Sequence, residues 1–270
     1  MKVRKDEKMK VVILAGGKGT RISEESHLRP KPMIEIGGRP ILWHIMKLYS
    51  HYGFHEFIIC CGYKGQMIKE YFLHYYTYQA DSTFSLADRN IEVHKSEVEP
   101  WKVTLANTGL ETLTAGRILK IKDYIEDDEF MLTYGDGVSD VNIQEVLDFH
   151  HQNGKIVTIT TTQPSGRFGA LKIDGESRVQ GFKEKARADQ AWVNAGFMVL
   201  NRKIFDYLGD GSEMLEQSPF EHLAQDGEMV AYKHDGFWSP MDTLRDKEYL
   251  EKLWAEEKAP WKVWDTSGKS

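Results

Sequence analysis

The first 160 residues repeat one pattern, in which a short apolar run precedes a longer segment whose apolar residues recur every three or four positions. In segment 40–53, for example, Trp43, Ile45 and Met46 fit one helical face, and Gly53 ends the segment. Strands are expected at 11–16, 56–62, 102–107, 129–136 and 155–162, and helices at 40–53, 66–76, 115–125 and 142–154. The alternation predicts a Rossmann-like, doubly wound α/β sheet, mostly parallel but mixed, with ligands at the carboxyl ends of the strands.

The pattern changes after Pro164. Short alternating segments follow at 168–174, 178–185, 192–201 and 228–238, and a helix is expected from about Thr243 to Glu257. These segments predict a small β-rich extension with a C-terminal helix rather than further βαβ units. Since the sequence has no internal repeat and no clear linker, we expect residues 1–270 to form a single domain.

Charge and composition narrow the classes of partner. The chain of 270 residues has a net charge of −6, which argues against a nucleic-acid polymer as the main partner. No apolar run reaches the roughly 20 residues of a membrane span, and the charged segment 1–10, which we expect to fray, lacks the apolar core of a signal peptide. Cys60 and Cys61 are neighbours in a predicted strand and should face opposite sides, so we expect free thiols and a cytoplasmic protein.

The stretch "VVILAGGKGTR" predicts a strand that runs into a glycine-rich turn. Gly16, Gly17 and Gly19 would let backbone N–H groups approach an anion, and Arg21 and Lys31 would add positive charge. An ordinary strand-to-helix turn with a solvated arginine explains the glycines equally well. The stretch matches neither a dinucleotide fingerprint, which needs glycine where Ile22 stands, nor a P-loop.

Two aspartates are candidates for metal binding. Asp136 follows an apolar strand, at the edge where the glycine-rich turn is also expected, and a carboxylate beside bound phosphate implies Mg²⁺. Asp-Gly is also a common turn dipeptide, so a turn is the alternative. Asp242 is the second candidate ligand; it could instead cap the last helix, although Thr243 and Asp246 could do so in its place.

Other polar clusters carry weaker signals. Lys183 and Lys185 alternate in "FKEK" and share a face, which fits either a phosphate contact or solvated charge. The histidines, including His150 and His151, lack metal-ligand spacing and are expected at the surface. No serine lies in a G-x-S-x-G elbow, so the commonest hydrolase signature is missing.

Taken together, these motifs resemble the sugar-1-phosphate nucleotidyltransferases. The resemblance begins with "LAGGKGTR…KPM" and continues in order through "FIICCGYKG", "VEPWKVTLANTG", "TYGDGVSD", "GRFGAL", "NAGFMVLN" and "GFWSPMDTLRDKEYLEKLW", so that it covers about residues 9–262. The "CCGYKG" and "EPWKVTL" stretches are similar to the cytidylyl branch of the family.

The resemblance implies a role for each matching residue. Residues 9–163 would form the nucleotide-binding half and residues 164–262 the half that binds sugar phosphate. Catalysis would use Arg21, Lys31 and Asp136, while Asp136 and Asp242 would share Mg²⁺. Substrates would contact Leu14, Ala15, Gly16, Gly17, Gly19, Thr20, Arg21, Lys31, Thr112, Arg117 and Gly135 on the nucleotide side, and Glu184, Lys185, Asn194 and Gly196 on the sugar side. Ala186 departs from the E-K-P of the family, which leaves the position of Lys185 open.

The resemblance also implies a reaction, in which a cytidylyl group passes from CTP to α-D-glucose 1-phosphate and yields CDP-glucose and pyrophosphate. It further implies a homo-oligomer, for which the family suggests six copies, and a role in deoxysugar supply for lipopolysaccharide O-antigen. A dTTP- or UTP-dependent transferase and a non-catalytic, nucleotide-binding regulatory subunit are the alternatives. Loss of Arg21, Lys31 or either aspartate would mark the latter, and all four are present.

Overall fold

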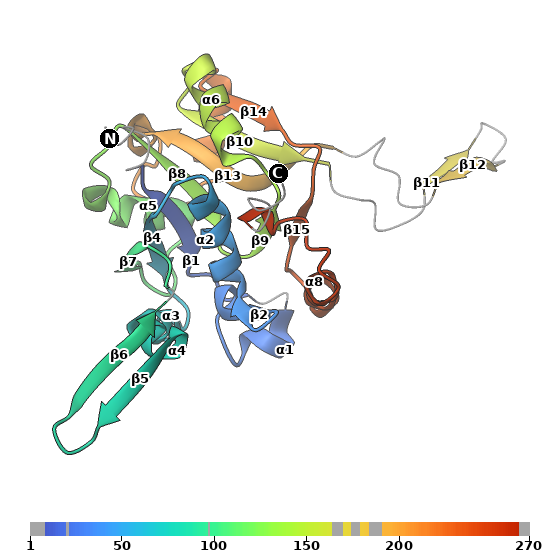
Figure 1. Ribbon diagram of the computed structural model, residues 1–270. Helices are drawn as coiled ribbons and strands as arrows, with labels where there is room; N and C mark the ends of the chain where they lie inside the picture. Colours follow the sequence, from blue (N-terminus) through green and yellow to red (C-terminus); the bar gives the residue numbers. More distant parts are fainter. Residues whose placement is uncertain are drawn as a thin grey trace.

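The core of the molecule is a seven-stranded mixed sheet (Figure 1). The computed structural model describes residues 9–19, 22–96, 98–163, 170–173, 179–183 and 191–264. Across the sheet the strands lie in the order β14 (Met229–Lys233), β10 (Val157–Thr162), β13 (Val193–Asn201), β8 (Glu129–Tyr134), β1 (Val11–Ala15), β4 (Glu56–Cys61) and β7 (Lys102–Asn107). Only β13 runs antiparallel to its neighbours. The predicted doubly wound, mostly parallel mixed sheet is confirmed.

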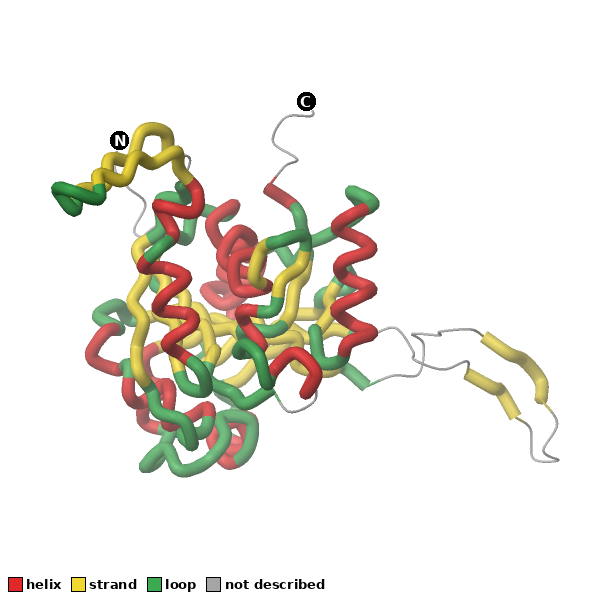
Figure 2. The backbone as a smooth tube through the Cα atoms, turned by 90° about the horizontal axis from the view of Figure 1, so that it is seen from below, coloured by secondary structure: helices red, strands yellow, loops and turns green. Residues whose placement is uncertain are grey.

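Helices cover both faces of this sheet, as Figures 1 and 2 show. One apolar cluster packs α2 (Ile41–His51), α6 (Ile143–Asn153) and α8 (Leu244–Ala255) on one face. The other cluster packs α5 (Thr114–Lys120) and α7 (Ser218–Gln225) on the opposite face. Successive residues of a strand point to opposite faces of the sheet and pack into the two clusters alternately. Cys61 therefore belongs to the first cluster and Cys60 to the second. Both cysteines are buried and free, as predicted.

The second half of the chain differs from the prediction in its strands. The predicted extension is only the hairpin of β11 (Ala170–Ile173) and β12 (Val179–Lys183), which stands apart from the body in Figure 1. The other two segments, β13 and β14, instead join the main sheet, β13 between β8 and β10. An alternating segment fits a pleated surface but does not say which sheet it joins, because its partners lie far away in the sequence.

Several smaller elements also differ from the expected pattern. The helix expected at 66–76 is broken at His74 into α3 (Gly65–Leu73) and α4 (Tyr75–Gln79), and a hairpin of β5 (Ala80–Ser85) and β6 (Asn90–Ser96) follows, which the sequence did not predict. The helix expected at 115–125 is α5 followed by the 3₁₀ turn η4 (Lys122–Tyr124). The remaining short elements are α1 (Ser23–Ser26), η3 (Lys31–Met33), β2 (Glu35–Ile36), β3 (Arg39–Pro40), β9 (Gly137–Ser139), η5 (Arg202–Asp206) and β15 (Trp238–Pro240).

The expected surface position is wrong for two histidines. His150 is buried on α6, where it continues the apolar spacing of Ile143, Val146 and Leu147, and its Nδ1 lies 2.9 Å from Thr158 Oγ1. Burial lowers the pKa of His150. His44 is also fully buried, and burial lowers its pKa to about 4. Helical spacing alone would have identified His150 as a core residue.

Two short contacts bring the ends of distant segments to one edge of the main sheet. Gly135 N donates to Leu14 O over 3.0 Å, which places the residues after β8 beside the end of β1. Strands β9 and β15 pair with Gly137 opposite Pro240, and Met241 N donates to Asp136 O over 2.8 Å.

Within the described residues, no helix is both long and apolar enough to cross a membrane.

Candidate active site

A cavity of about 400 Å³ opens at the carboxyl ends of β1 and β8. Parallel strands of an α/β sheet present their following loops at this edge, where such folds bind ligands. The cavity is lined by Leu14, Ala15, Gly16, Gly17, Lys18, Gly19, Lys31, Pro32, Thr112, Leu113, Thr114, Arg117, Tyr134, Gly135, Asp136 and Met214. Its lining therefore combines the glycine-rich turn, the first turn of α5 and the residues after β8.

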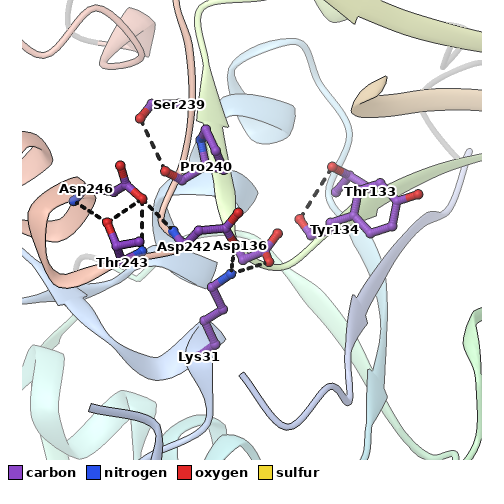
Figure 3. A network of polar contacts seen from close by, with 9 residues as sticks. All are labelled: Lys31, Thr133, Tyr134, Asp136, Ser239, Pro240, Asp242, Thr243 and Asp246. Carbon is purple, nitrogen blue, oxygen red and sulfur yellow. Dashed lines mark hydrogen bonds and ion pairs between the residues drawn. The ribbon is translucent and has the colours of Figure 1, made fainter. Parts of the chain in front are cut away.

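One side of the site is an ion-paired group that we call the acidic cluster: Lys31, Asp136 and Asp242 (Figure 3). The Lys31 ammonium lies 2.7 Å from Asp136 Oδ2 and 2.5 Å from Asp242 Oδ1. The Lys31 side chain is only 7% exposed, whereas that of Asp136 is 32% exposed. The two aspartates, 106 residues apart in the sequence, thus share one cation.

The helix that follows Asp242 has another cap. Thr243 is the N-cap of α8, because its Oγ1 accepts from Asp246 N over 3.2 Å and the Asp246 side chain accepts from Thr243 N over 2.9 Å. This reciprocal pair is a capping box of the kind the sequence offered. Capping therefore does not account for the Asp242 carboxylate, which points toward Lys31.

The acidic cluster fits a divalent cation bound together with phosphate. Two carboxylates already lie around one positive charge, and Mg²⁺ commonly takes one or two protein carboxylates and completes its shell with waters and phosphate oxygens. An all-protein metal site is a poorer fit, because the described residues contain no group of three or more His, Cys, Asp or Glu side chains placed to hold an ion.

Another part of the site is built around Arg117, and we call Arg117 with Gly16, Thr108 and Gly109 the arginine cluster. Its guanidinium donates to Thr108 Oγ1 over 2.6 Å, to Gly109 O over 2.9 Å and to Gly16 O over 3.0 Å. Arg117 is 4% exposed, and burial lowers its pKa. Although Arg117 lines the cavity, these bonds commit much of its donor capacity to protein oxygens.

The arginine cluster explains one glycine of the turn by space. A Cβ on Gly16 would lie 2.1 Å from Arg117 Nη1, which is far inside contact distance. Gly17 has no such neighbour, since a Cβ there would meet nothing within 4 Å. Gly19 has φ of +62°, a left-handed conformation that favours glycine. The three glycines therefore serve different local needs.

A third group links Asn194 to the cavity. Asn194 Nδ2 donates to the Tyr134 hydroxyl over 3.0 Å, and that hydroxyl donates to Glu216. Glu216 also accepts from Thr114 Oγ1 over 2.8 Å, at the start of α5. Burial raises the pKa of Tyr134. Sequence reasoning missed Tyr134, Thr114 and Glu216; the position of Tyr134 directly before Gly135 was the one available signal.

The structure brings most of the sequence-predicted residues together. The cavity is lined by Leu14, Ala15, Gly16, Gly17, Gly19, Lys31, Thr112, Arg117, Gly135 and Asp136. Asp242 does not line the cavity but binds Lys31, which does, and Asn194 likewise binds Tyr134 of the cavity. Gly196 N donates to Asn194 Oδ1 over 2.8 Å. Thr20, Arg21, Glu184 and Lys185 lie outside the described residues, and of Lys183 only the backbone, at the end of β12, is described.

Comparisons with known proteins agree with this geometry. The nucleotidyl transferase family model matches residues 10–251. A glucose-1-phosphate cytidylyltransferase of Salmonella typhi is 55% identical over 258 residues, which cover 95% of this chain and 100% of the relative. A probable glucose-1-phosphate cytidylyltransferase of Bacillus subtilis is 45% identical over 257 residues, with coverage of 95% and 100%. The crystal structure of HddC from Yersinia pseudotuberculosis matches with a TM-score of 0.65 at 22% identity, over 91% of this chain and 99% of that chain, which supports the fold alone.

Proposed function

This chain belongs to the nucleotidyl transferase family, in the group of the glucose-1-phosphate cytidylyltransferases, and on that premise we propose that it makes CDP-glucose. A phosphate oxygen of α-D-glucose 1-phosphate attacks the α-phosphorus of CTP. A new oxygen–phosphorus bond forms as the bond to the β-phosphate breaks, and pyrophosphate leaves in line with the attack.

One observation supports this function most strongly. The cavity joins the glycine-rich turn after β1 to Lys31 and Asp136, and Lys31 in turn binds Asp242. Backbone N–H groups of the turn supply donors for a polyphosphate, and the lysine supplies a charge. Such a site is built for two anionic reactants rather than for a hydride or an acyl group.

The reaction places few demands on acid–base chemistry. The attacking phosphate oxygen is already anionic, so no side chain has to remove a proton. The repulsion between the two substrates is the barrier that the protein must offset, and it does so by holding them in line and by countering the charge of the departing pyrophosphate. We assign this role to the glycine-rich turn, Lys31 and Arg21, of which Arg21 lies outside the described residues.

Asp136 and Asp242 would hold the metal ion of the family, which we propose to be Mg²⁺. When bound, a divalent cation at these carboxylates neutralises part of the triphosphate charge. The support is the shared ion pair with Lys31, which shows that both carboxylates reach one cation.

We assign the sugar phosphate to the side of the site formed by Asn194 and Gly196. Asn194 is tied to the cavity through Tyr134, and Gly196, within β13, has φ of +78°, a left-handed conformation that favours glycine. Glu184 and Lys185 would complete this side, by resemblance to the family, and lie outside the described residues.

The remaining proposals concern the surroundings of the enzyme. The free thiols of Cys60 and Cys61 support a reducing, cytoplasmic location. Exposed apolar side chains on α3, α4 and the β5–β6 hairpin, among them Leu73, Tyr78 and Leu86, support a homo-oligomer, with six copies as the expectation. Light scattering of the purified protein would measure the number of copies.

A panel of nucleoside triphosphates tests the proposed function. The protein is incubated with glucose 1-phosphate, Mg²⁺ and either CTP, UTP, dTTP, GTP or ATP, and release of pyrophosphate is followed. We expect turnover with CTP and little with the others, and none with the Asp136→Asn variant. Turnover with UTP or dTTP instead of CTP would show that this other nucleotide is the substrate. The absence of turnover with any of the five would support the regulatory alternative.

A further inference from the structure

The acidic cluster holds its own cation. The Lys31 ammonium lies between the two carboxylates proposed to bind metal, 2.7 Å from one and 2.5 Å from the other. We propose that Lys31 occupies the metal position of the nucleotide-free enzyme, so that a divalent cation binds firmly only when a triphosphate takes over the ammonium. This inference rests on the proposed function, because it concerns the same two aspartates.

The charges favour such an exchange. Lys31 places one positive charge against two carboxylates, and its side chain is nearly buried, so water screens the attraction only weakly. A divalent ion that approaches Asp136 and Asp242 must first displace this ammonium or lie beside it. Metal binding at these two carboxylates is therefore opposed by the ammonium of the protein itself.

The path of the Lys31 side chain leads past the glycine-rich turn. A Cβ on Gly19 would lie 3.3 Å from Lys31 Cβ and 3.9 Å from Lys31 Cδ, so the stem of the lysine runs along that turn before its ammonium reaches the aspartates. Lys31 also lines the cavity. Phosphate oxygens bound at the turn would come close to the stem, and rotation about side-chain bonds alone would redirect the ammonium to them.

The backbone around Lys31 is poorly suited to move in its place. Lys31 begins η3 between Pro30 and Pro32, and both prolines are buried. Proline restricts its own φ angle and the conformation of the residue before it. The side chain of Lys31 is therefore the part that moves, and the aspartates remain where β9, β15 and α8 hold them.

The exchange would couple the metal to the nucleotide. If triphosphate draws Lys31 away from the aspartates, nucleotide tightens metal binding, and by reciprocity metal tightens nucleotide binding. The empty enzyme would then remain largely metal-free, and its two carboxylates would gain a metal ion when the polyphosphate arrives.

Titration of the nucleotide-free protein with Mn²⁺, followed by electron paramagnetic resonance of the free ion, tests this proposal. Removing one neighbouring charge from a carboxylate pair should tighten Mn²⁺ binding in Lys31→Gln by about tenfold or more relative to the wild type. Lys31→Arg keeps the charge and should bind Mn²⁺ as weakly as the wild type. Lys102→Gln, which removes a surface lysine paired with Glu56 on the edge of the sheet, controls for net charge and should also match the wild type.

Two results would overturn the proposal. One is equal Mn²⁺ affinity in the wild type and Lys31→Gln. The other is micromolar binding to the wild type without nucleotide, a measurement that does not depend on whether any variant folds. Base preference plays no part in the titration, so a preference for UTP would refute only the proposed substrate. Equal affinities in a protein that turns over CTP would refute only the role of Lys31.

Discussion

The acidic cluster and the arginine cluster each contain one buried basic side chain, but the partners of the two side chains differ. Arg117 donates to neutral oxygens, among them the carbonyls of Gly16 and Gly109. These oxygens carry no charge, so no other cation competes with Arg117 for them. Lys31 donates to two carboxylates, for which a metal ion can compete, and phosphate can compete for its ammonium. Burial of a cation therefore does not define its role. From these partners we propose that Arg117 fixes the shape of the site while Lys31 takes part in its chemistry.

The largest expected effect lies in the acidic cluster. Asp136→Asn or Asp242→Asn should each lower kcat by about a thousandfold or more, because each removes a carboxylate proposed to hold the cation that offsets substrate repulsion. Circular dichroism should show that the fold survives, since Lys31 keeps one carboxylate partner in either variant. Steady-state pyrophosphate release measures kcat. An Asp242→Asn variant with full activity and a lower melting temperature would show that Asp242 is only structural.

In the arginine cluster the expected loss is of stability. Arg117→Ala removes the donors to Gly16 and Gly109 and should lower the free energy of unfolding by about 2–4 kcal/mol. Gly16→Ala should have a comparable effect, because its Cβ would displace the guanidinium, and the double variant should lose less than the sum of the two. Urea denaturation gives these values.

The neighbouring glycine provides a matched control for that prediction. A Cβ on Gly17 meets nothing within 4 Å, so Gly17→Ala should retain the stability of the wild type. If Gly16→Ala and Gly17→Ala are equally stable, the packing of Arg117 against the turn does not matter and the contrast between the two clusters is lost.

A smaller effect is expected at Tyr134, which lines the cavity. Tyr134→Phe leaves the Asn194 amide and Glu216 without their shared hydroxyl, which should cost about 1–2 kcal/mol of stability. Because Asn194 is assigned to the sugar side, KM for glucose 1-phosphate should rise several-fold while KM for CTP stays nearly constant. A rise in KM for CTP alone would move Asn194 to the nucleotide side.

The smallest effect is expected at Thr243, and it tests whether the role of Asp242 depends on the cap of the helix that follows. Thr243→Ala removes the side-chain cap of α8 and should lower stability by about 1 kcal/mol. Turnover should change little, because the carboxylate of Asp242 is held by Lys31 rather than by the cap. Thermal melting and the pyrophosphate assay compare the two properties. A loss of activity as large as that of Asp242→Asn would mean that the cap positions the ligand.

Local patterns predicted most of the sheet and its helices. The apolar runs of β1, β4, β7, β8 and β10 stood out, as did the segment 142–154 that forms α6. The place of β13 could not be predicted, because an alternating segment fits any pleated surface and its partners, β8 and β10, are set by tertiary packing. The β5–β6 hairpin was missed because its residues include few buried apolar positions that would mark strands.

The candidate site shows the same limit. The glycine-rich turn and Asp136 each follow a recognisable strand, and Asp242 was a candidate from its place before the last predicted helix. The contacts that these residues make with one another could not be predicted from the sequence. The contact of Arg117 with nucleotide stays a prediction, whereas its bonds to Gly16 and Gly109 were not foreseen. Glu216 was overlooked because it meets Tyr134 only in the folded chain.

A double-mutant cycle on the two aspartates tests the central claim most directly. Values of kcat are measured at saturating substrates and Mg²⁺ for the wild type, Asp136→Asn, Asp242→Asn and the double variant. If both carboxylates hold one cation, removing the second adds little to the loss caused by the first, and the double variant should be about as slow as the slower single variant. A double variant slowed by the product of the two single factors would show that the aspartates act independently, and would contradict a shared metal site.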